Sequence, residues 1–352
     1  MSPPRKTVPS KRAQRVKLSD VAAASGVHYS TVSRVLRPGF KGRISDDVAE
    51  RVRAVARELG YRPNAVASSL RTRSTKSIGL IVHDMGDPIY PPILSGIESV
   101  LSPNGFAVLV GNTGYDVEAE LNLVDRMASR LVDGIFLATT RLQDPAVERC
   151  EQLGIPLVSV LRHTENATTP AVINDCFWGM EALTSHIIEN GHRDIAVIIA
   201  PQDLSTAQDR WRGVQTAIEK HGLSLPEHRI AHVDRMSAEE GETAAQTLLN
   251  AVPAPPEAII AVNDLVAIGA IRACKNFGLR VPEDISISGY NDIPLMDMLS
   301  PPLSTVHMHL ETIGRTAGEM MLEYLENPDL PARTTRVKPE LVLRSSLRDL
   351  RG

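Results

Sequence analysis

Six polar or charged side chains stand just beyond apolar runs of the chain between residues 77 and 292. They are Asp84, Tyr90, Arg162, Arg210, Asn263 and Asn291. Carboxylates accept hydrogen bonds, guanidinium groups donate them, and amides do both. A small molecule with many hydroxyl groups needs donors and acceptors together. The set therefore predicts a binding site for a polar metabolite, in which Tyr90 and Met236 are candidate apolar faces.

The apolar runs that carry these side chains alternate with amphipathic stretches. The candidate strands are SIGLIVH, FAVLVGN, DGIFLA, PLVSV, DIAVIIA, EAIIAV and DISISGY, and the candidate helices include residues 92–101, 118–130, 178–189 and 265–277. Strand and helix in alternation predict doubly wound parallel sheets, and the length of this region favours two lobes. Ligands bind such sheets in the crevice at the carboxyl ends of the strands.

Each of these positions also has a purely structural interpretation. Arg210 could be a cation on the surface of a helix, and Asn263 or Asn291 could cap the helix that follows it. The sequence alone leaves these alternatives open.

A second group of hydrogen-bonding side chains lies in residues 16–39. Tyr29, Ser30 and Arg34 share the polar face of a short predicted helix, and Gly26 marks a tight turn before it. The apolar faces of the two helices around that turn are Leu18, Val21 and Ala22, then Val32, Val35 and Leu36. A helix-turn-helix places such a polar face in the major groove of DNA. A plain helical hairpin is the alternative.

The distribution of charge favours DNA. Residues 1–76 hold 17 Lys and Arg against 5 Asp and Glu, whereas the remainder holds 21 against 37. A basic module joined to an acidic body suits attraction to phosphate at one end only. Residues 1–15 are basic and Pro-rich without an apolar core, so we expect a disordered basic arm rather than a secretory signal.

A third helix is predicted after the hairpin, with Ser45 as its N-cap and Gly60 as its left-handed end. Val48, Val52, Val55 and Leu59 form its apolar face. The segment that follows Pro63 predicts about two helical turns, which are too short to be stable alone in water.

Other chemistry finds little support. The chain has no Gly-rich phosphate loop, G-x-S-x-G motif or paired Cys motif, so no enzyme, cofactor or metal is expected. His307 and His309 could bind a metal from one side of a strand, but a third ligand is not evident, and an interface or core role is favoured. Three scattered cysteines predict buried thiols in a reducing cytoplasm. No apolar run approaches the roughly 20 residues that span a bilayer.

The strings LSDVAAASGV, TVSRVL, RVRAVARELGYRPNAVASSLR and SIGLIV, between Val16 and Val82, resemble the N-terminal part of the LacI/GalR family of bacterial transcription regulators. The resemblance implies an all-α helix-turn-helix headpiece and an α/β body of two doubly wound parallel-sheet lobes, like a periplasmic binding protein. The implied divisions are a basic arm 1–15, headpiece 16–62, hinge helix and linker 63–76, first lobe 77–174 with 305–334, and second lobe 175–304 with 335–346.

The resemblance also implies how DNA is read. The positions expected to contact DNA are Tyr29, Ser30, Arg34, Asn64, Ala67 and Leu70. The first three would read base edges, and Leu70, in a hinge helix from Asn64 to Arg71, would be the wedge inserted at a base step. Alternatively, Leu70 is a linker residue docked on the body. His28 replaces the small hydroxyl that often caps the recognition helix in this family, which predicts a weaker start to that helix.

In the body, the resemblance places Arg210, Asn263 and Asn291 on family pocket positions. Leu161 and Met308 stand where relatives often carry Asp and Gln. With Arg162 beside Leu161, a sugar acid or a phosphate is one candidate ligand.

We therefore expect a homodimeric, cytoplasmic transcription factor, associated with the nucleoid when bound to DNA. It would be a repressor that binds a pseudo-palindromic operator and responds to a sugar, sugar acid or similar effector, without a membrane partner. The alternatives are a small-molecule binding protein that does not bind DNA and a sugar-metabolising enzyme with an appended DNA module.

Overall fold

The computed structural model describes residues 16–36, 44–61, 74–166, 168–250 and 254–351. The chain divides into two compact units, residues 1–75 and 76–352, called here the headpiece and the body. The predicted basic arm, the loop from Arg37 to Arg43 and the hinge positions Asn64, Ala67 and Leu70 lie outside the described residues. Within the described part, no helix combines the length and the apolar character needed to cross a membrane.

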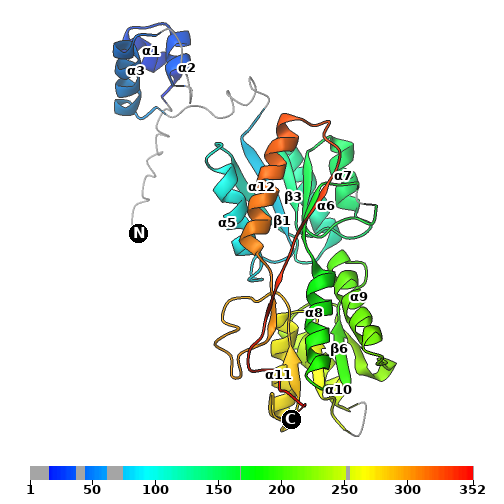
Figure 1. Ribbon diagram of the computed structural model, residues 1–352. Helices are drawn as coiled ribbons and strands as arrows, with labels where there is room; N and C mark the ends of the chain where they lie inside the picture. Colours follow the sequence, from blue (N-terminus) through cyan, green and yellow to red (C-terminus); the bar gives the residue numbers. More distant parts are fainter. Residues whose placement is uncertain (1–15, 37–43, 62–73, 167, 251–253, 352) are drawn as a thin grey trace, which may run out of the picture. The chain divides into compact units, whose positions relative to one another are not determined.

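The described headpiece consists of α1 (Leu18–Ser25), α2 (Tyr29–Val35) and α3 (Asp46–Glu58), as Figure 1 shows. Gly26 ends α1 with a φ of 66°, which confirms the predicted left-handed turn. The predicted apolar faces meet in one small core, in which the side chains of Val21, Val32 and Val52 are fully buried. This packing stabilises three helices that would be too short to persist alone.

Two details of α3 differ from the prediction. Ser45 occupies the N-cap position, but its side chain makes no capping hydrogen bond. Leu59 was expected on the apolar face, yet 38% of it is exposed because α3 ends at Glu58 and the chain turns at Gly60, whose φ is 66°.

The body alternates strands and helices, as predicted. Its strands are β1 (Ser77–Val82), β2 (Ala107–Asn112), β3 (Gly134–Leu137), β4 (Leu157–Leu161), β5 (Ala171–Asn174), β6 (Ile195–Ile199), β7 (Ile230–His232), β8 (Ala258–Ala261), β9 (Ser286–Ser288), β10 (Thr305–His307), β11 (Thr334–Val337) and β12 (Glu340–Val342). Its helices are α5 (Tyr90–Leu101), α6 (Val117–Ser129), α7 (Pro145–Leu153), α8 (Cys176–Glu189), α9 (Ser205–Lys220), α10 (Ala238–Asn250), α11 (Asp264–Asn276) and α12 (Leu310–Glu326), with a 3-10 turn η1 (Glu227–Arg229).

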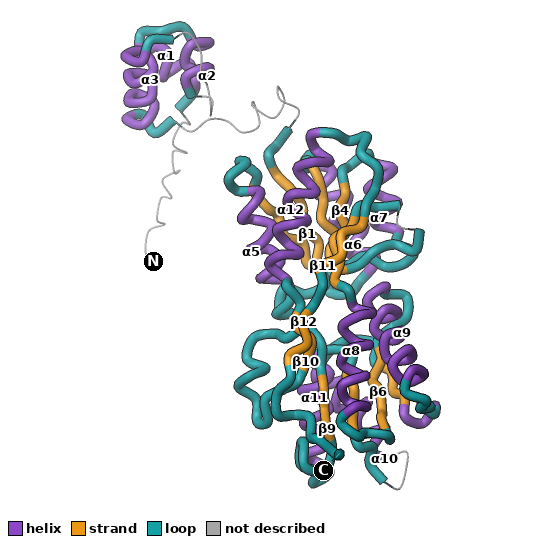
Figure 2. Tube along the Cα trace, viewed as in Figure 1, coloured by secondary structure: helices purple, strands orange, loops and turns teal. Residues whose placement is uncertain are grey.

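Two parallel sheets define the two lobes of the body. The first has the order β11-β5-β4-β3-β1-β2 and the second the order β7-β6-β8-β9, and every pairing within them is parallel. The fold class predicted from the sequence is confirmed. A separate antiparallel pair, β10 with β12, was not foreseen. Figure 2 shows this pair below the first sheet, beside the start of the second lobe.

Alternate side chains of each strand pack into different apolar clusters, because successive residues point to opposite faces of a sheet. In β1, Ile78 and Leu80 pack with residues of α5 and α12, while Ile81 packs with residues of α6 and α7. In the second sheet, α8 and α9 cover one face, and α10 and α11 cover the other. All three cysteines are buried, unpaired thiols in these clusters, as expected.

The chain passes between the lobes after β5, between β9 and α12, and between β11 and β12 (Figure 1). The predicted change of lobe at residue 335 falls too early, since β11 pairs with β5 in the first sheet. Likewise, β10 was assigned to the first lobe, but it pairs with β12, and bridges join Ser304 to Ser288 and His307 to Asn291. Both strands thus belong to the crossover region.

Candidate functional site

The polar face of α2 is presented at the surface of the headpiece. Tyr29 is 59% exposed, Arg34 is exposed and Ser30 is half-buried. The Nδ1 atom of His28 accepts a hydrogen bond from the Ser30 backbone N–H at 3.3 Å and lies 2.8 Å from the Ser30 hydroxyl. The expectation of a weak start to this helix is therefore wrong, because the imidazole of His28 supplies the cap.

In the first lobe, Arg162 follows β4 directly and is buried. Its NH1 group donates to His83 Nε2 at 3.1 Å and to the Thr139 carbonyl oxygen at 3.3 Å. Burial and the adjacent charge of Arg162 lower the pKa of His83 to about 3, so the imidazole is neutral. Since Nε2 accepts from an arginine, Nδ1 carries the proton and donates to Thr113 Oγ1 at 3.2 Å. The His83 ring also stacks on Tyr115, with centroids 4.6 Å apart.

The loop between β1 and α5 contributes the other first-lobe residues. Asp84 is exposed and accepts a hydrogen bond from the Gly86 backbone N–H at 2.8 Å. Tyr90 is buried, and burial raises the pKa of its hydroxyl. Asp87 is half-buried, its Oδ1 accepts from the Ile89 N–H at 3.1 Å, and burial raises its pKa. Asp87 was not singled out from the sequence, although it lies inside the stretch that was.

In the second lobe, Arg210 projects from α9 and is only 6% exposed, which rules out a surface cation. Its NH1 group donates to the Val262 carbonyl oxygen at 2.7 Å and its NH2 group to Asn291 Oδ1 at 3.0 Å. Its guanidinium carbon lies 3.9 Å from the centroid of the Tyr290 ring. Asn291 has a φ of 116°, a conformation that aims its amide at Arg210 instead of capping a helix.

Asn263 has the structural role left open by the sequence. Its Oδ1 accepts from the Val266 N–H at 2.9 Å and caps α11, while its Nδ2 donates to the Met236 carbonyl oxygen at 3.4 Å. The adjacent Asp264 is buried, and its carboxylate accepts from the Ile293 N–H and the Thr305 hydroxyl at 2.9 and 2.6 Å. Burial raises the pKa of Asp264 to about 7.

Electrostatic interactions and hydrogen bonds connect the polar residues of the two lobes. The charges of Arg162 and Arg210 both act on Asp87, and Arg210 helps burial to lower the pKa of Arg162. Direct polar contacts also span the lobes: for example, Arg141 NH1 lies 2.6 Å from Asp203 Oδ2, and the His163 N–H donates to Ser205 Oγ at 3.1 Å. We call this region, at the strand ends of both lobes, the cleft.

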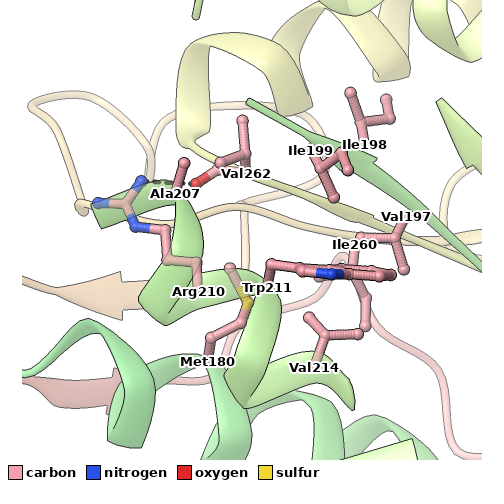
Figure 3. A pocket seen from close by; sticks show the side chains of 10 residues that line it. All are labelled: Met180, Val197, Ile198, Ile199, Ala207, Arg210, Trp211, Val214, Ile260 and Val262. Carbon is pink, nitrogen blue, oxygen red and sulfur yellow. Dashed lines mark hydrogen bonds between the residues drawn. The ribbon is translucent and has the colours of Figure 1, made fainter. Parts of the chain in front are cut away.

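A different pocket lies within the second lobe, between α8, α9 and the strands β6 and β8. It is lined by Met180, Val197, Ile198, Ile199, Ala207, Arg210, Trp211, Val214, Ile260 and Val262. Figure 3 shows the Arg210 guanidinium turned away from the Trp211 ring and bonded to Val262. Since the remaining lining is apolar, this pocket belongs to the core and does not suit a polar ligand.

The two histidines near β10 pair with carboxylates. His307 Nδ1 lies 3.0 Å from Asp292 Oδ2, and His309 Nε2 lies 3.4 Å from Glu340 Oε1. Among the described residues, no three His, Cys, Asp or Glu side chains are grouped to hold a metal ion.

Comparisons with known proteins give a family match for the headpiece and another for the body. Residues 17–64 match the family model "Bacterial regulatory proteins, lacI family", and residues 184–347 match the periplasmic binding protein-like domain. The chain is 32% identical over 332 residues to the HTH-type transcriptional repressor PurR of Aliivibrio fischeri, covering 94% of this chain and 98% of that one. It is 32% identical over 336 residues to the ribose operon repressor of Haemophilus influenzae, covering 95% and 99%.

Two solved structures are similar over nearly the whole chain. The lac repressor dimer bound to operator and the anti-inducer ONPF is 27% identical, with a TM-score of 0.84 and coverage of 95% and 100%. The complex of the transcriptional regulator CelR with cellobiose is 28% identical, with a TM-score of 0.73 and coverage of 94% and 100%. The chain belongs to the lacI family of bacterial regulatory proteins and is a ligand-responsive, DNA-binding transcriptional regulator.

Proposed function

We propose that this chain is a cytoplasmic repressor of a carbohydrate or sugar-acid utilisation operon, bound to the nucleoid as a homodimer on a pseudo-palindromic operator. The observation that carries this proposal is the exposed polar face of α2 in a basic headpiece. Tyr29, Ser30 and Arg34 offer a hydroxyl-bearing ring, a small hydroxyl and a guanidinium fork to base edges. Asn64, Ala67 and Leu70 would complete the interface from the hinge.

The effector binds in the cleft between the lobes. Asp84, Tyr90 and Arg162 contribute from the first lobe, and Arg210 and Asn291 from the second, while Asn263 supports the site by capping α11. A ligand that contacts both lobes binds their closed arrangement more tightly than an open one, and only such a difference can change DNA affinity. One related regulator, CelR, forms a complex with cellobiose, and another relative is named the ribose operon repressor, which supports a carbohydrate-like effector.

Selection of genomic DNA fragments by the purified full-length chain tests this proposal. We expect enrichment of one pseudo-palindromic motif, and Arg34→Ala should lose about 1–3 kcal/mol of binding free energy with relaxed specificity at one base pair. Arg149→Ala is the matched control, since Arg149 is a half-buried arginine of α7 paired with Asp125 in the body. Fragments enriched without any shared motif contradict the proposal. Recovery of the bound effector unchanged distinguishes a regulator from an enzyme.

A further inference from the structure

Two buried arginines, one from each lobe, have no carboxylate counter-ion within 4.0 Å among the described residues. Of the described arginines, only Arg162, Arg210 and Arg229 are buried, with 6%, 6% and 3% of their surface exposed. Arg229 is paired with the carboxylate of Asp194. No carboxylate oxygen of the described residues lies within 4.0 Å of a guanidinium nitrogen of Arg162 or Arg210. The two arginines without a countercharge are therefore both in the cleft.

The hydrogen-bond partners of these two arginines are neutral. Arg162 donates to an uncharged imidazole, His83, and to a backbone carbonyl. Arg210 donates to a backbone carbonyl and to the amide oxygen of Asn291, and its Nε atom has no partner. Burying a cation without a compensating charge is costly, so such groups are normally paired. Groups whose pKa is perturbed by burial and by neighbouring charges, as that of Arg162 is, are concentrated at functional sites.

Arg162 and Arg210 lie at the same junction of the lobes, since His163, the residue after Arg162, donates its N–H to Ser205 Oγ at 3.1 Å, and Ser205 begins the helix that carries Arg210. The charge of Arg210 also contributes to the lowered pKa of Arg162.

The charges of both arginines act on the carboxyl group of Asp87. Burial raises the pKa of this carboxyl, and its Oδ1 accepts a hydrogen bond from the Ile89 N–H. Asp87 forms no ion pair within 4.0 Å with either arginine, so its charge acts on them only from a longer range. Two further neighbours carry no charge: Leu161 precedes Arg162 in the chain, and the Met308 sulfur lies 3.8 Å from Arg210 NH2.

From this arrangement we infer that the effector is an anion, whose carboxylate or phosphate group binds Arg162 and Arg210 together across the cleft. This inference rests on the proposed function and narrows its effector to one chemical class. A planar guanidinium fork suits the paired oxygens of either group, and hydrogen bonds to it are strengthened by the charge. Binding would supply the missing countercharge and draw the lobes together. The remaining hydroxyl groups of the effector would reach Asp87 and Asn291.

Thermal unfolding of the full-length chain tests this inference directly. Each sugar acid and each sugar phosphate of a panel is compared with its neutral parent sugar at matched ionic strength. A ligand present at about ten times its Kd should raise the Tm by about 2–3 °C. We expect this shift either with a sugar acid or with a sugar phosphate. The set that produces the shift identifies the anionic group as a carboxylate or a phosphate. A neutral parent sugar that stabilises the chain as well as its acid or phosphate does, or the absence of any shift with both anionic sets, overturns the inference.

Substitution of either arginine provides the second test. Arg162→Gln and Arg210→Gln should each weaken anion binding at least about tenfold, because each removes a charged donor. Neither should lower the Tm without ligand, since each also relieves an uncompensated buried charge. Arg149→Gln is the control: Arg149 is a half-buried arginine of the same body, and its substitution should leave both values unchanged. If Arg162→Gln does not fold, Arg162→Lys retains the charge and should show an intermediate loss of affinity. Equal anion binding by wild type and a folded variant overturns the inference.

The two proposals fail separately. If the chain binds a motif in DNA but only a neutral sugar changes its affinity for DNA, the proposal of an anionic effector is wrong, whereas the proposal of a repressor is supported. If no DNA motif is bound, the proposal of a repressor is wrong. The Tm shift with anions then still tests whether the cleft binds an anionic ligand.

Discussion

The guanidinium group of Arg210 stacks on the ring of Tyr290, 3.9 Å from its centroid. The Tyr290 hydroxyl accepts a hydrogen bond from Asn174 Nδ2 at 2.7 Å. Asn174 ends β5 in the first sheet, and Tyr290 follows β9 of the second. A cleft arginine is thus linked through one buried tyrosine to a crossover between the lobes, which provides a physical route from the ligand to lobe movement.

The hydroxyl of Tyr290 should matter more for coupling than for ligand binding. Tyr290→Phe keeps the ring under Arg210 but removes the acceptor for Asn174, at a stability cost of about 1 kcal/mol. We expect effector affinity to change less than about threefold, while the effect of the effector on operator affinity falls about fivefold or more, within the usual range of coupling energies. Operator titrations with and without effector measure this.

The control for that variant is Tyr324→Phe, which removes a hydroxyl that donates to the Pro331 carbonyl at 2.6 Å, away from the cleft. A Tyr290→Phe variant with wild-type coupling would show that the contact with Asn174 is structural only.

The buried carboxyl of Glu120 should make stability fall as pH rises. Glu120 in α6 accepts a hydrogen bond from Thr139, but burial, the largest effect, and the charge of Asp144 raise its pKa from 4.5 to about 7. The folded state therefore binds this proton more tightly than the unfolded state, and stability declines between pH 4.5 and about 7.

Glu120→Gln should raise the free energy of unfolding at pH 8 by roughly 3 kcal/mol and change it little at pH 4.5. Urea unfolding at several pH values measures the difference between variant and wild type. Glu118→Gln, an exposed neighbour in the same helix, should show no such trend. A Glu120→Gln difference that does not grow with pH would be evidence against an uncharged Glu120 in the fold.

The ion pair between Arg141 and Asp203 should favour closure of the two lobes and contribute little to the free energy of unfolding. Its side chains are 29% and 48% exposed, so the pair contributes at most about 1 kcal/mol. Asp203→Asn should weaken effector binding by up to about fivefold at low salt and less at 0.5 M salt, because salt screens exposed charges. Calorimetric titration at two salt concentrations measures this. Asp125→Asn breaks the Arg149 pair inside one lobe and should not change affinity; equal effects of the two variants exclude a role in closure.

The imidazole cap of α2 predicts a contrast between two substitutions. His28→Ala removes the acceptor for the Ser30 N–H and should cost about 1 kcal/mol, which corresponds to about fivefold faster hydrogen exchange in residues 29–36. His28→Ser supplies another capping oxygen and should exchange at nearly the wild-type rate. Mass spectrometry of the peptide that contains α2 measures the exchange rates of both variants. Identical rates for His28→Ala and wild type would exclude the capping role of His28.

Much of this molecule was predictable from local sequence pattern. The periodicity of Val21, Val32 and Val52 identified the headpiece core, and apolar runs identified the longer strands. Contacts between residues far apart in the chain were not predictable. Examples are the proximity of Asp87 to both cleft arginines and the hydrogen bond from Arg162 to His83. The pair β10–β12 was missed because three-residue strands carry almost no periodicity, and their partners are chosen by tertiary packing.

The central claim is that a small molecule in the cleft controls the affinity of the headpiece for DNA. Operator affinity of the full-length chain, with and without effector, in wild type and in Arg210→Ala, tests it most directly. The account predicts a change of about 5–150-fold in wild type, and none in Arg210→Ala, whose affinity without effector stays at the wild-type level. An unchanged response in a folded Arg210→Ala variant, or a wild-type affinity indifferent to every bound ligand, would contradict it.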